Sequence, residues 1–317
     1  MAAPRLIMKM EVVDLHRGPG DVNVVEFRHP RRPLLPAFDA GSHVDVHLPD
    51  GRVRQYSLMG NPADLSKYVI GVKREDGGRG GSAWIHANLN VGDVVAVSTP
   101  RNHFKLHDAA KSHLLLAGGI GVTPMISMAR ALKWDGRAFV LHFFARSRSS
   151  APLLAELEAE IPSCSLKLHF DDDPNTVINM ADLLKDQPNG MHLYYCGPPG
   201  FMAWTKASAA HWQANTVHFE AFQPDTDPDF VPTAFTMKLR SSGRDLEVPA
   251  NVSALTVLRA AGVPLLSSCE NGVCGSCECG FVSGEPIHRD AVLTPEAKSH
   301  RFVPCVSRAT GQIVLDL

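Results

Sequence analysis

Four cysteines stand within eleven residues of the stretch SSCENGVCGSCECGF, and a fifth follows in RFVPCVS. The first three have the spacing C-x4-C-x2-C, which together with one distant cysteine is typical of a [2Fe-2S] site. Zinc sites need two short pairs and four-iron sites need a C-x2-C-x2-C-x3-C-P run, and neither pattern occurs here. The spacing therefore predicts a [2Fe-2S] cluster ligated by Cys269, Cys274, Cys277 and Cys305.

Two other uses of the cysteines stay open at this point. A thioredoxin-like motif would use Cys274 and Cys277 alone, which leaves Cys269 and Cys305 without a role. If CECGF enters a strand, Cys277 and Cys279 point to the same face, so either could reach the iron. The spacing favours Cys277, and we expect Cys279 to be a small buried thiol.

The cysteine loop lies in a segment that has the elements of a small domain. TAFTMKLRSSGRDLEVPA alternates apolar and polar residues on both sides of a turn, which predicts a hairpin. VSALTVLRAAG is typical of a helix that ends at a glycine, and GQIVLDL predicts a last strand. Residues 233–317 therefore resemble a plant-type ferredoxin, an α+β domain of the β-grasp type.

A glycine-rich turn joins a strand to a helix in KSHLLLAGGIGVTPMISMARALKW. Free N–H groups and the helix dipole at such a turn favour a phosphate group. The chain then alternates strands and helices, which predicts an α/β doubly wound parallel sheet over residues 108–222, with ligands at the carboxyl ends of the strands. The residues expected to meet there are Gly118, Gly119, Gly121, Thr123, Arg146, Ser147, Cys196, Gly197 and Pro198.

Residues 1–107 contain short alternating segments instead, which predict an antiparallel β-barrel. Three motifs then follow one another along the chain: R-x-Y-S at residues 54–57, G-G-x-G-x-T-P at 118–124 and C-G-P at 196–198. Together they resemble the ferredoxin-NADP reductase-like flavoenzymes. With the ferredoxin segment last, the whole chain resembles the phthalate dioxygenase reductase family, the class IA reductases of Rieske oxygenases.

This resemblance implies a flavin site in the barrel. Arg54 would pair with the flavin phosphate, Tyr56 would pack on the isoalloxazine ring, and Ser57 would form a hydrogen bond near the reactive nitrogen. The domain order implies FMN rather than FAD. The rest of the site is expected to consist of Val72, Lys73, Gly80, Gly81, Ser82 and, as an aromatic beside the nicotinamide, Phe222.

The chemistry also calls for a flavin. A nicotinamide delivers two electrons as one hydride, whereas a [2Fe-2S] cluster accepts one electron at a time, so a carrier able to do both must stand between them. We therefore expect electrons to pass from NADH through FMN and the cluster to a Rieske oxygenase. That oxygenase would act on an aromatic or similar small substrate by dioxygenation or O-demethylation, and no side chain of the reductase would itself be catalytic. A haem monooxygenase as acceptor, or a cysteine-rich metal-binding or redox-sensing module, are the alternatives.

The choice of coenzyme depends on the end of the second parallel strand. Arg146 and Arg148 follow this strand, where an arginine can meet the 2′-phosphate of NADPH. The same Arg-Ser pair is found in family members that use NADH. NADH is therefore favoured, and NADPH is the alternative.

Composition limits the partners and the cell compartment that we expect for the protein. The net charge of −2 gives no electrostatic case for binding nucleic acid or an anionic membrane. We expect a monomer in the cytoplasm, where cysteines stay reduced. Residues 223–232, rich in proline and aspartate, are expected to form a stiff linker that sets the distance from flavin to iron, with the cysteine loop facing the exposed flavin edge.

Overall fold

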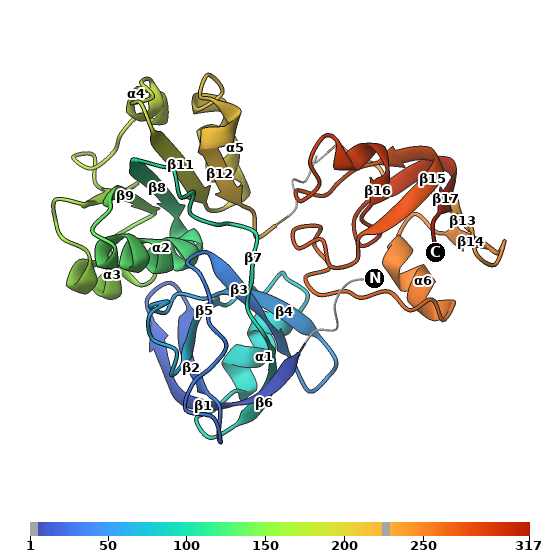
Figure 1. The fold of residues 1–317 in the computed structure, drawn as a ribbon, viewed down its shortest axis with the longest axis horizontal. Helices are drawn as coiled ribbons and strands as arrows, with labels where there is room; N and C mark the ends of the chain where they lie inside the picture. Colours follow the sequence, from blue (N-terminus) through green and yellow to red (C-terminus); the bar gives the residue numbers. More distant parts are fainter. Residues whose placement is uncertain (1–5, 224–228) are drawn as a thin grey trace. The chain divides into compact units, whose positions relative to one another are not determined.

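The computed structural model describes residues 6–223 and 229–317, so residues 224–228 of the expected linker lie outside the described residues. The chain forms two compact units, one ending at Glu220 and the other beginning at Ala221 (Figure 1). Across the two described ranges, we find no helix with the length and apolar character that crossing a membrane requires. The domain boundaries after residues 107 and 232 stay predictions.

The first unit begins with the antiparallel sheet that the alternating segments predicted. Its strands run in the order β4-β3-β6-β1-β2-β5 with β7 beside β3, and a bridge between Leu58 and Ile70 joins the two ends of the sheet. Inward-facing side chains such as Phe27 and Val44 form its core. The elements are β1 (Ile7–Gly18), β2 (Val22–Arg28), β3 (Ser42–His47), β4 (Val53–Ser57), β5 (Tyr68–Lys73), α1 (Gly81–Asn88), β6 (Val94–Ser98) and β7 (Arg101–Asn102).

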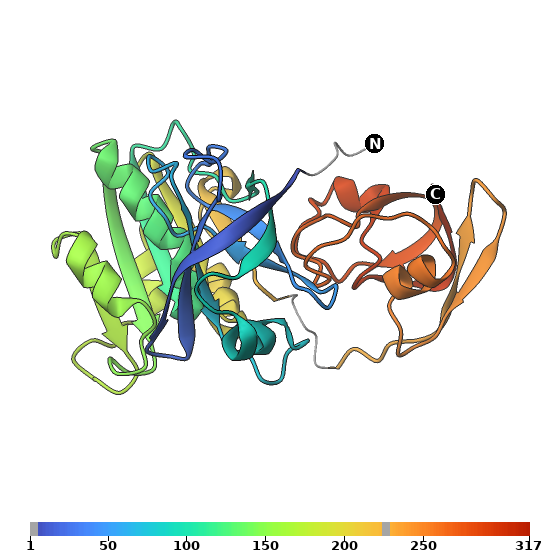
Figure 2. The same cartoon turned by 90° about the horizontal axis from the view of Figure 1, so that it is seen from below.

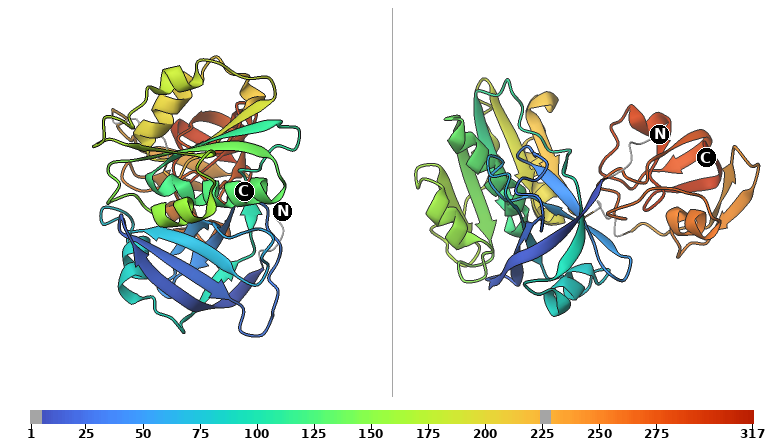
Figure 3. Two further views of the ribbon diagram at one scale, coloured as in Figure 1. Left: turned by 90° about the vertical axis from the view of Figure 1, so that its left-hand side faces the viewer. Right: turned by 60° about the horizontal axis from the view of Figure 1, so that its bottom comes forward.

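A parallel sheet of strand order β10-β9-β8-β11-β12 completes this unit, as the strand–helix alternation predicted. Helices cover both faces of the sheet, with α2 and α3 on one side and α4 and α5 on the other (Figure 3, left). The strands are β8 (Ser112–Gly118), β9 (Ala138–Ala145), β10 (Leu166–Phe170), β11 (Met191–Cys196) and β12 (Val217–Glu220). The helices are α2 (Val122–Trp134), α3 (Leu154–Glu160), α4 (Met180–Leu184) and α5 (Pro199–Ser208), with 3-10 turns η1 (Gly119–Gly121) and η2 (Ala214–Thr216).

The second unit is a mixed sheet of strand order β14-β13-β17-β15-β16, in which β13 and β17 are parallel. Figure 2 shows α6 against this sheet. The helix begins after Ser253 because the Ser253 hydroxyl accepts a hydrogen bond from the N–H of Thr256. The elements are β13 (Phe235–Leu239), β14 (Asp245–Val248), α6 (Ala254–Ala260), β15 (Cys279–Ile287), η3 (Ala297–Ser299), β16 (Arg301–Phe302) and β17 (Arg308–Leu315).

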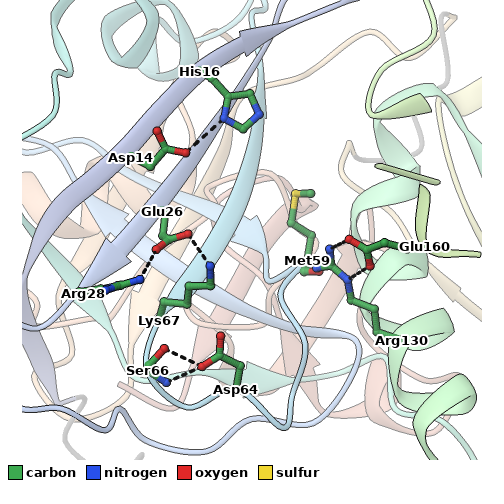
Figure 4. Close-up of polar contacts among 10 residues, drawn as sticks. All are labelled: Asp14, His16, Glu26, Arg28, Met59, Asp64, Ser66, Lys67, Arg130 and Glu160. Carbon is green, nitrogen blue, oxygen red and sulfur yellow. Dashed lines mark hydrogen bonds and ion pairs between the residues drawn. The ribbon is translucent and has the colours of Figure 1, made fainter. Parts of the chain in front are cut away.

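Helix α2 fastens the parallel sheet to the loop that follows β4. Arg130 donates hydrogen bonds to both carboxylate oxygens of Glu160 and to the main-chain oxygen of Met59 (Figure 4). One turn earlier, the hydroxyl of Ser127 donates to the main-chain oxygen of Gly60 at 3.1 Å. Since the side chain of Arg130 is only 20% exposed, water replaces these hydrogen bonds poorly. The two sheets are therefore joined at a defined place.

Replacing Arg130 by methionine removes the donor that Met59 and Glu160 share. We expect the free energy of unfolding of the first unit to fall by about 2 kcal/mol. Arg148→Met is the matched control, because the ion pair of Arg148 with Glu158 is exposed and is worth about 0.5 kcal/mol. All four tryptophans precede Glu220, so urea unfolding followed by tryptophan fluorescence measures the first unit. Equal losses in the two variants would contradict the prediction.

Candidate redox sites

Two of the predicted phosphate-binding features meet at the start of α1. Arg54 on β4 donates to the main-chain oxygen of Arg79 at 2.8 Å. Its side chain crosses Gly81, where an added Cβ would lie 2.5 Å from the Arg54 Cγ and Nε. Gly80 takes a left-handed conformation with φ of 74°, which favours glycine. The guanidinium and the helix N-terminus thus form one cationic cradle that fits a phosphate.

Other predicted flavin residues lie around this cradle. Tyr56, on the same side of β4 as Arg54, is partly buried against the core of the antiparallel sheet. Ser82 follows Gly81 in α1, and its hydroxyl accepts a hydrogen bond from the N–H of Glu75. The Val72 side chain is fully buried in the core, whereas Lys73 is exposed beside Glu75. Roles for Val72 and Lys73 stay predictions.

The glycine-rich turn after β8 lies against the turn after β11. An added Cβ at Gly121 would lie 2.3 Å from the main-chain oxygen of Cys196, and one at Gly118 would lie 2.9 Å from the ring of Pro198. Gly197 packs equally closely on the ring of Phe201. The structure therefore brings the two predicted strand ends together, and only glycine fits at these positions. Free N–H groups at the start of α2 make this turn suited to a pyrophosphate.

Thr123, Arg146 and Ser147 follow β8 and β9 at the same edge of the parallel sheet. Thr123 is buried at the first turn of α2, with its hydroxyl donating to the main-chain oxygen of Ile120. Arg146 is exposed after β9, and its main-chain oxygen accepts from the N–H of Asp172. Ser147 forms a hydroxyl hydrogen bond of 2.7 Å with Ser150. Phe222 belongs to the second unit, so its role beside the flavin stays a prediction.

Glu220, which the sequence patterns did not single out, lies where the two sheets meet. Its carboxylate accepts a hydrogen bond of 3.2 Å from the hydroxyl of Ser57, and its side chain is only 10% exposed. Burial raises the pKa of Glu220 to about 7. Cys196 is its direct neighbour across β11 and β12, and burial together with this carboxylate raises the pKa of the thiol well above its usual value. This group of side chains can hold a proton at Glu220 and keeps the Cys196 thiol neutral.

The four cysteines predicted to bind iron are buried and form two pairs. A hydrogen bond joins the sulfurs of Cys269 and Cys274, and another joins those of Cys277 and Cys305. In each pair this bond lowers the pKa of one thiol, that of Cys274 or Cys277, toward the thiolate form that ligates metal. Among the described residues, no three His, Cys, Asp or Glu side chains converge as a single metal ion requires. Two thiol pairs fit two irons instead.

The backbone between these cysteines turns toward the sulfurs. Gly272 and Gly275 have φ angles of 72° and 65°, in the left-handed region that favours glycine. The N–H of Asn271 donates to the sulfur of Cys269 at 3.3 Å, and the N–H of Gly272 donates to Cys305. Such hydrogen bonds stabilise thiolates and tune the potential of a bound cluster. The loop therefore fits the predicted cluster in both donors and shape.

Cys279 lies in a different environment from the four predicted iron ligands. Cys277 and Cys279 do not share a strand face, because β15 begins at Cys279 and Cys277 lies in the loop before it. Cys279 packs in the core of the second unit, and its thiol lies 3.7 Å from the main-chain oxygen of Phe302. Burial raises its pKa to about 12. The expectation of a small buried thiol agrees with this environment.

Serine variants separate the two cysteines experimentally. We expect Cys277→Ser to lose most of the iron and of the visible iron–sulfur absorbance, because one iron would lack a thiolate. Cys279→Ser is the matched control and should keep both at the level of the unchanged protein. Iron and sulfide per chain are measured after purification under anaerobic conditions. If Cys277→Ser kept its iron, the assignment of Cys277 as a ligand would be contradicted.

The chain is similar to known proteins in both sequence and structure. Residues 97–217 match the family model described as dimethylamine monooxygenase subunit DmmA-like, N-terminal domain, and residues 237–310 match the 2Fe-2S iron-sulfur cluster binding domain. The chain is 39% identical to the phthalate dioxygenase reductase of Burkholderia cepacia, over 98% of this chain and 97% of that protein.

Two solved structures are similar along almost the whole chain. One, described as phthalate dioxygenase reductase, a modular structure for electron transfer from pyridine nucleotides to [2Fe-2S], has a TM-score of 0.79, 39% identity and coverage of 98% of both chains. The other, an intact type IV self-sufficient cytochrome P450 monooxygenase, has a TM-score of 0.82 and 35% identity, covering 98% of this chain and 41% of that one. By sequence and by structure, the chain belongs to the phthalate dioxygenase reductase family.

Proposed function

We propose that this reductase passes electrons from NADH, through FMN and a [2Fe-2S] cluster, to a Rieske non-haem iron oxygenase. The observation that carries the proposal is the presence, in one chain, of a phosphate cradle at Gly81, a glycine turn at Gly121 and two buried thiol pairs. Membership of the family supports the same order of carriers. The oxygenase would act on an aromatic or similar small substrate by dioxygenation or O-demethylation.

The residues of the first unit would bind and orient the two cofactors. Bound FMN accepts the two electrons of a hydride together and releases them singly. Arg54 and the first turn of α1 would hold its phosphate, and Tyr56 would lie along the ring. The turn ending at Gly121 would hold the pyrophosphate of the coenzyme at the carboxyl ends of β8 and β11.

Glu220 would serve this site as a proton acceptor. When both electrons of a hydride leave singly, one proton stays behind for every NADH oxidised. The carboxylate of Glu220 lies 3.2 Å from the hydroxyl of Ser57, and a pKa of about 7 lets it take up and release a proton near neutral pH. Ser57 would therefore both position a ring atom and connect it to Glu220.

We infer NADH rather than NADPH from the contacts of Arg148. Its guanidinium forms an ion pair with Glu158 and lies 5.8 Å over the ring of Phe170. A 2′-phosphate would have to compete with the Glu158 carboxylate for this arginine. Arg146 is the other cation at this edge, so NADPH is kept as the alternative.

A haem monooxygenase is the second candidate for the electron acceptor. The observation that favours it is the similarity, over 98% of this chain, to part of a self-sufficient cytochrome P450 monooxygenase. In that case the carriers would be the same and only the protein that accepts the electrons would differ.

Anaerobic titration with NADH tests the order of the carriers. We expect the flavin absorbance to bleach first and the iron–sulfur absorbance to fall as more NADH is added. Cys277→Ser is the control, since it should show flavin bleaching alone. If NADH reduced the flavin while an intact cluster stayed oxidised, the proposed order of electron transfer would be contradicted. The position of the cysteine loop at the flavin edge stays a prediction, which the rate of the second phase would probe.

Reconstitution with candidate acceptors tests the partner. We expect NADH consumption to become coupled to product formation when a Rieske oxygenase encoded near the reductase is added, and not when a haem monooxygenase is added. Consumption without an acceptor gives the background. Coupled turnover with the haem enzyme alone would replace the first candidate by the second.

A further inference from the structure

A histidine and an aspartate lie beside the cysteine loop, directly after β15. The side chain of Asp290 is fully buried, and that of His288 is 13% exposed. The Nδ1 atom of His288 lies 3.5 Å from the Oδ2 atom of Asp290. Within the described residues, neither atom has a normal hydrogen bond to any other group. Among the described residues, the ion-pair contact with each other is the polar contact recorded at these two atoms.

The two ring nitrogens of His288 face oxygen atoms. Its Nε2 atom lies 2.9 Å from the main-chain oxygen of Lys298, which can only accept a hydrogen bond. Its Nδ1 atom faces the Oδ2 atom of Asp290 at 3.5 Å. This arrangement gives a protonated imidazole a hydrogen-bond acceptor at one nitrogen and a carboxylate beside the other.

Asp290 also shapes the segment that covers the predicted iron ligands. Its other oxygen, Oδ1, accepts hydrogen bonds from the N–H groups of Val292, at 3.3 Å, and Leu293, at 2.8 Å. Both side chains pack against the buried cluster of residues that contains Cys277 and Cys305. The carboxylate therefore fixes the turn whose apolar side chains cover one of the two thiol pairs.

The same segment supports the backbone of the cysteine loop. The N–H of Ala291 donates to the main-chain oxygen of Gly272 at 3.0 Å. An added Cβ at Gly272 would lie 3.2 Å from the Cα of Asp290, so the two backbones are in close contact. On its other side, Gly272 donates its N–H to Cys305. One short chain of contacts thus leads from the carboxylate of Asp290 to a ligand sulfur.

Charged residues near His288 and Asp290 make other contacts. Arg289 lies with its guanidinium 3.7 Å from the ring centre of Phe230. On the cysteine loop itself, Glu270 forms an ion pair of 2.6 Å with Arg259. Lys298 faces His288 with its main-chain oxygen. His288 and Asp290 therefore form a separate buried pair of side chains.

We propose that His288 and Asp290 are positioning residues of the [2Fe-2S] cluster, and that their opposite charges balance to set its reduction potential. The inference rests on the proposed assignment of Cys269, Cys274, Cys277 and Cys305 as ligands. A negative charge beside the cluster opposes the arrival of an electron, and a positive charge favours it. Because burial weakens screening by solvent, removing one member of the pair exposes the cluster to the other.

The reduction potential of the cluster, measured in the full-length iron-loaded protein by anaerobic dye-coupled titration, tests the proposal. Asp290→Asn keeps the shape of the side chain and should raise the potential. His288→Gln removes the positive charge and should lower it. The double variant should return close to the unchanged protein. Glu285→Gln is the matched control, because it removes the same charge as Asp290→Asn from an exposed position on β15, and its shift should be much smaller.

Each outcome of the titration either supports or contradicts the role of the His288–Asp290 pair. Shifts of opposite sign with recovery in the double variant support the charge pair, whereas shifts of the same sign, or none beyond the control, overturn it. If a single variant takes up no iron, recovery of iron in the double variant supports the pair, and a double variant without iron overturns it. Absence of a [2Fe-2S] signal from the unchanged protein would instead refute the proposed ligands, so the two failures are distinguishable.

Discussion

The main chain after β8 is in direct contact with the main chain at the end of β11. The arrangement of the rest of the first unit depends on this close contact. A side chain at Gly121 would collide with the main-chain oxygen of Cys196. On its other edge β11 pairs with β12, whose last residue, Glu220, reaches the antiparallel sheet at Ser57. The proposed coenzyme turn and the proposed flavin strand therefore share one wall. A larger residue at the glycine would move the strand ends apart and Glu220 with them.

Features of the fold that depend on residues close together in the sequence could be predicted from the spacing of those residues. The glycines before α2 and the turn before α1 are local patterns, and each predicted the helix that the structure contains. The alternation of strands and helices also predicted that the turns after β8 and β11 would meet, because parallel strands place their carboxyl ends at one edge.

Contacts between individual side chains that lie far apart in the sequence could not be predicted in this way. Glu220 meets Ser57 across 163 positions of sequence, and nothing near either residue indicates the other. The same holds for Asp290 and Gly272, whose contact depends on how β15 leads back toward the cysteine loop. Cys279 shows that the exact start of a strand is also hard to predict, since the environment of its thiol depends on the residue at which β15 begins. A change of two positions in that start decides whether a thiol lies in the core or beside the loop.

Helix α2 gives the first unit a further property. Its first turn follows the proposed coenzyme turn, and its middle is bound to the loop after β4 through Ser127 and Arg130. Because a helix is stiff over this length, we expect the separation between the coenzyme turn and the loop after β4 to be fixed when the chain folds.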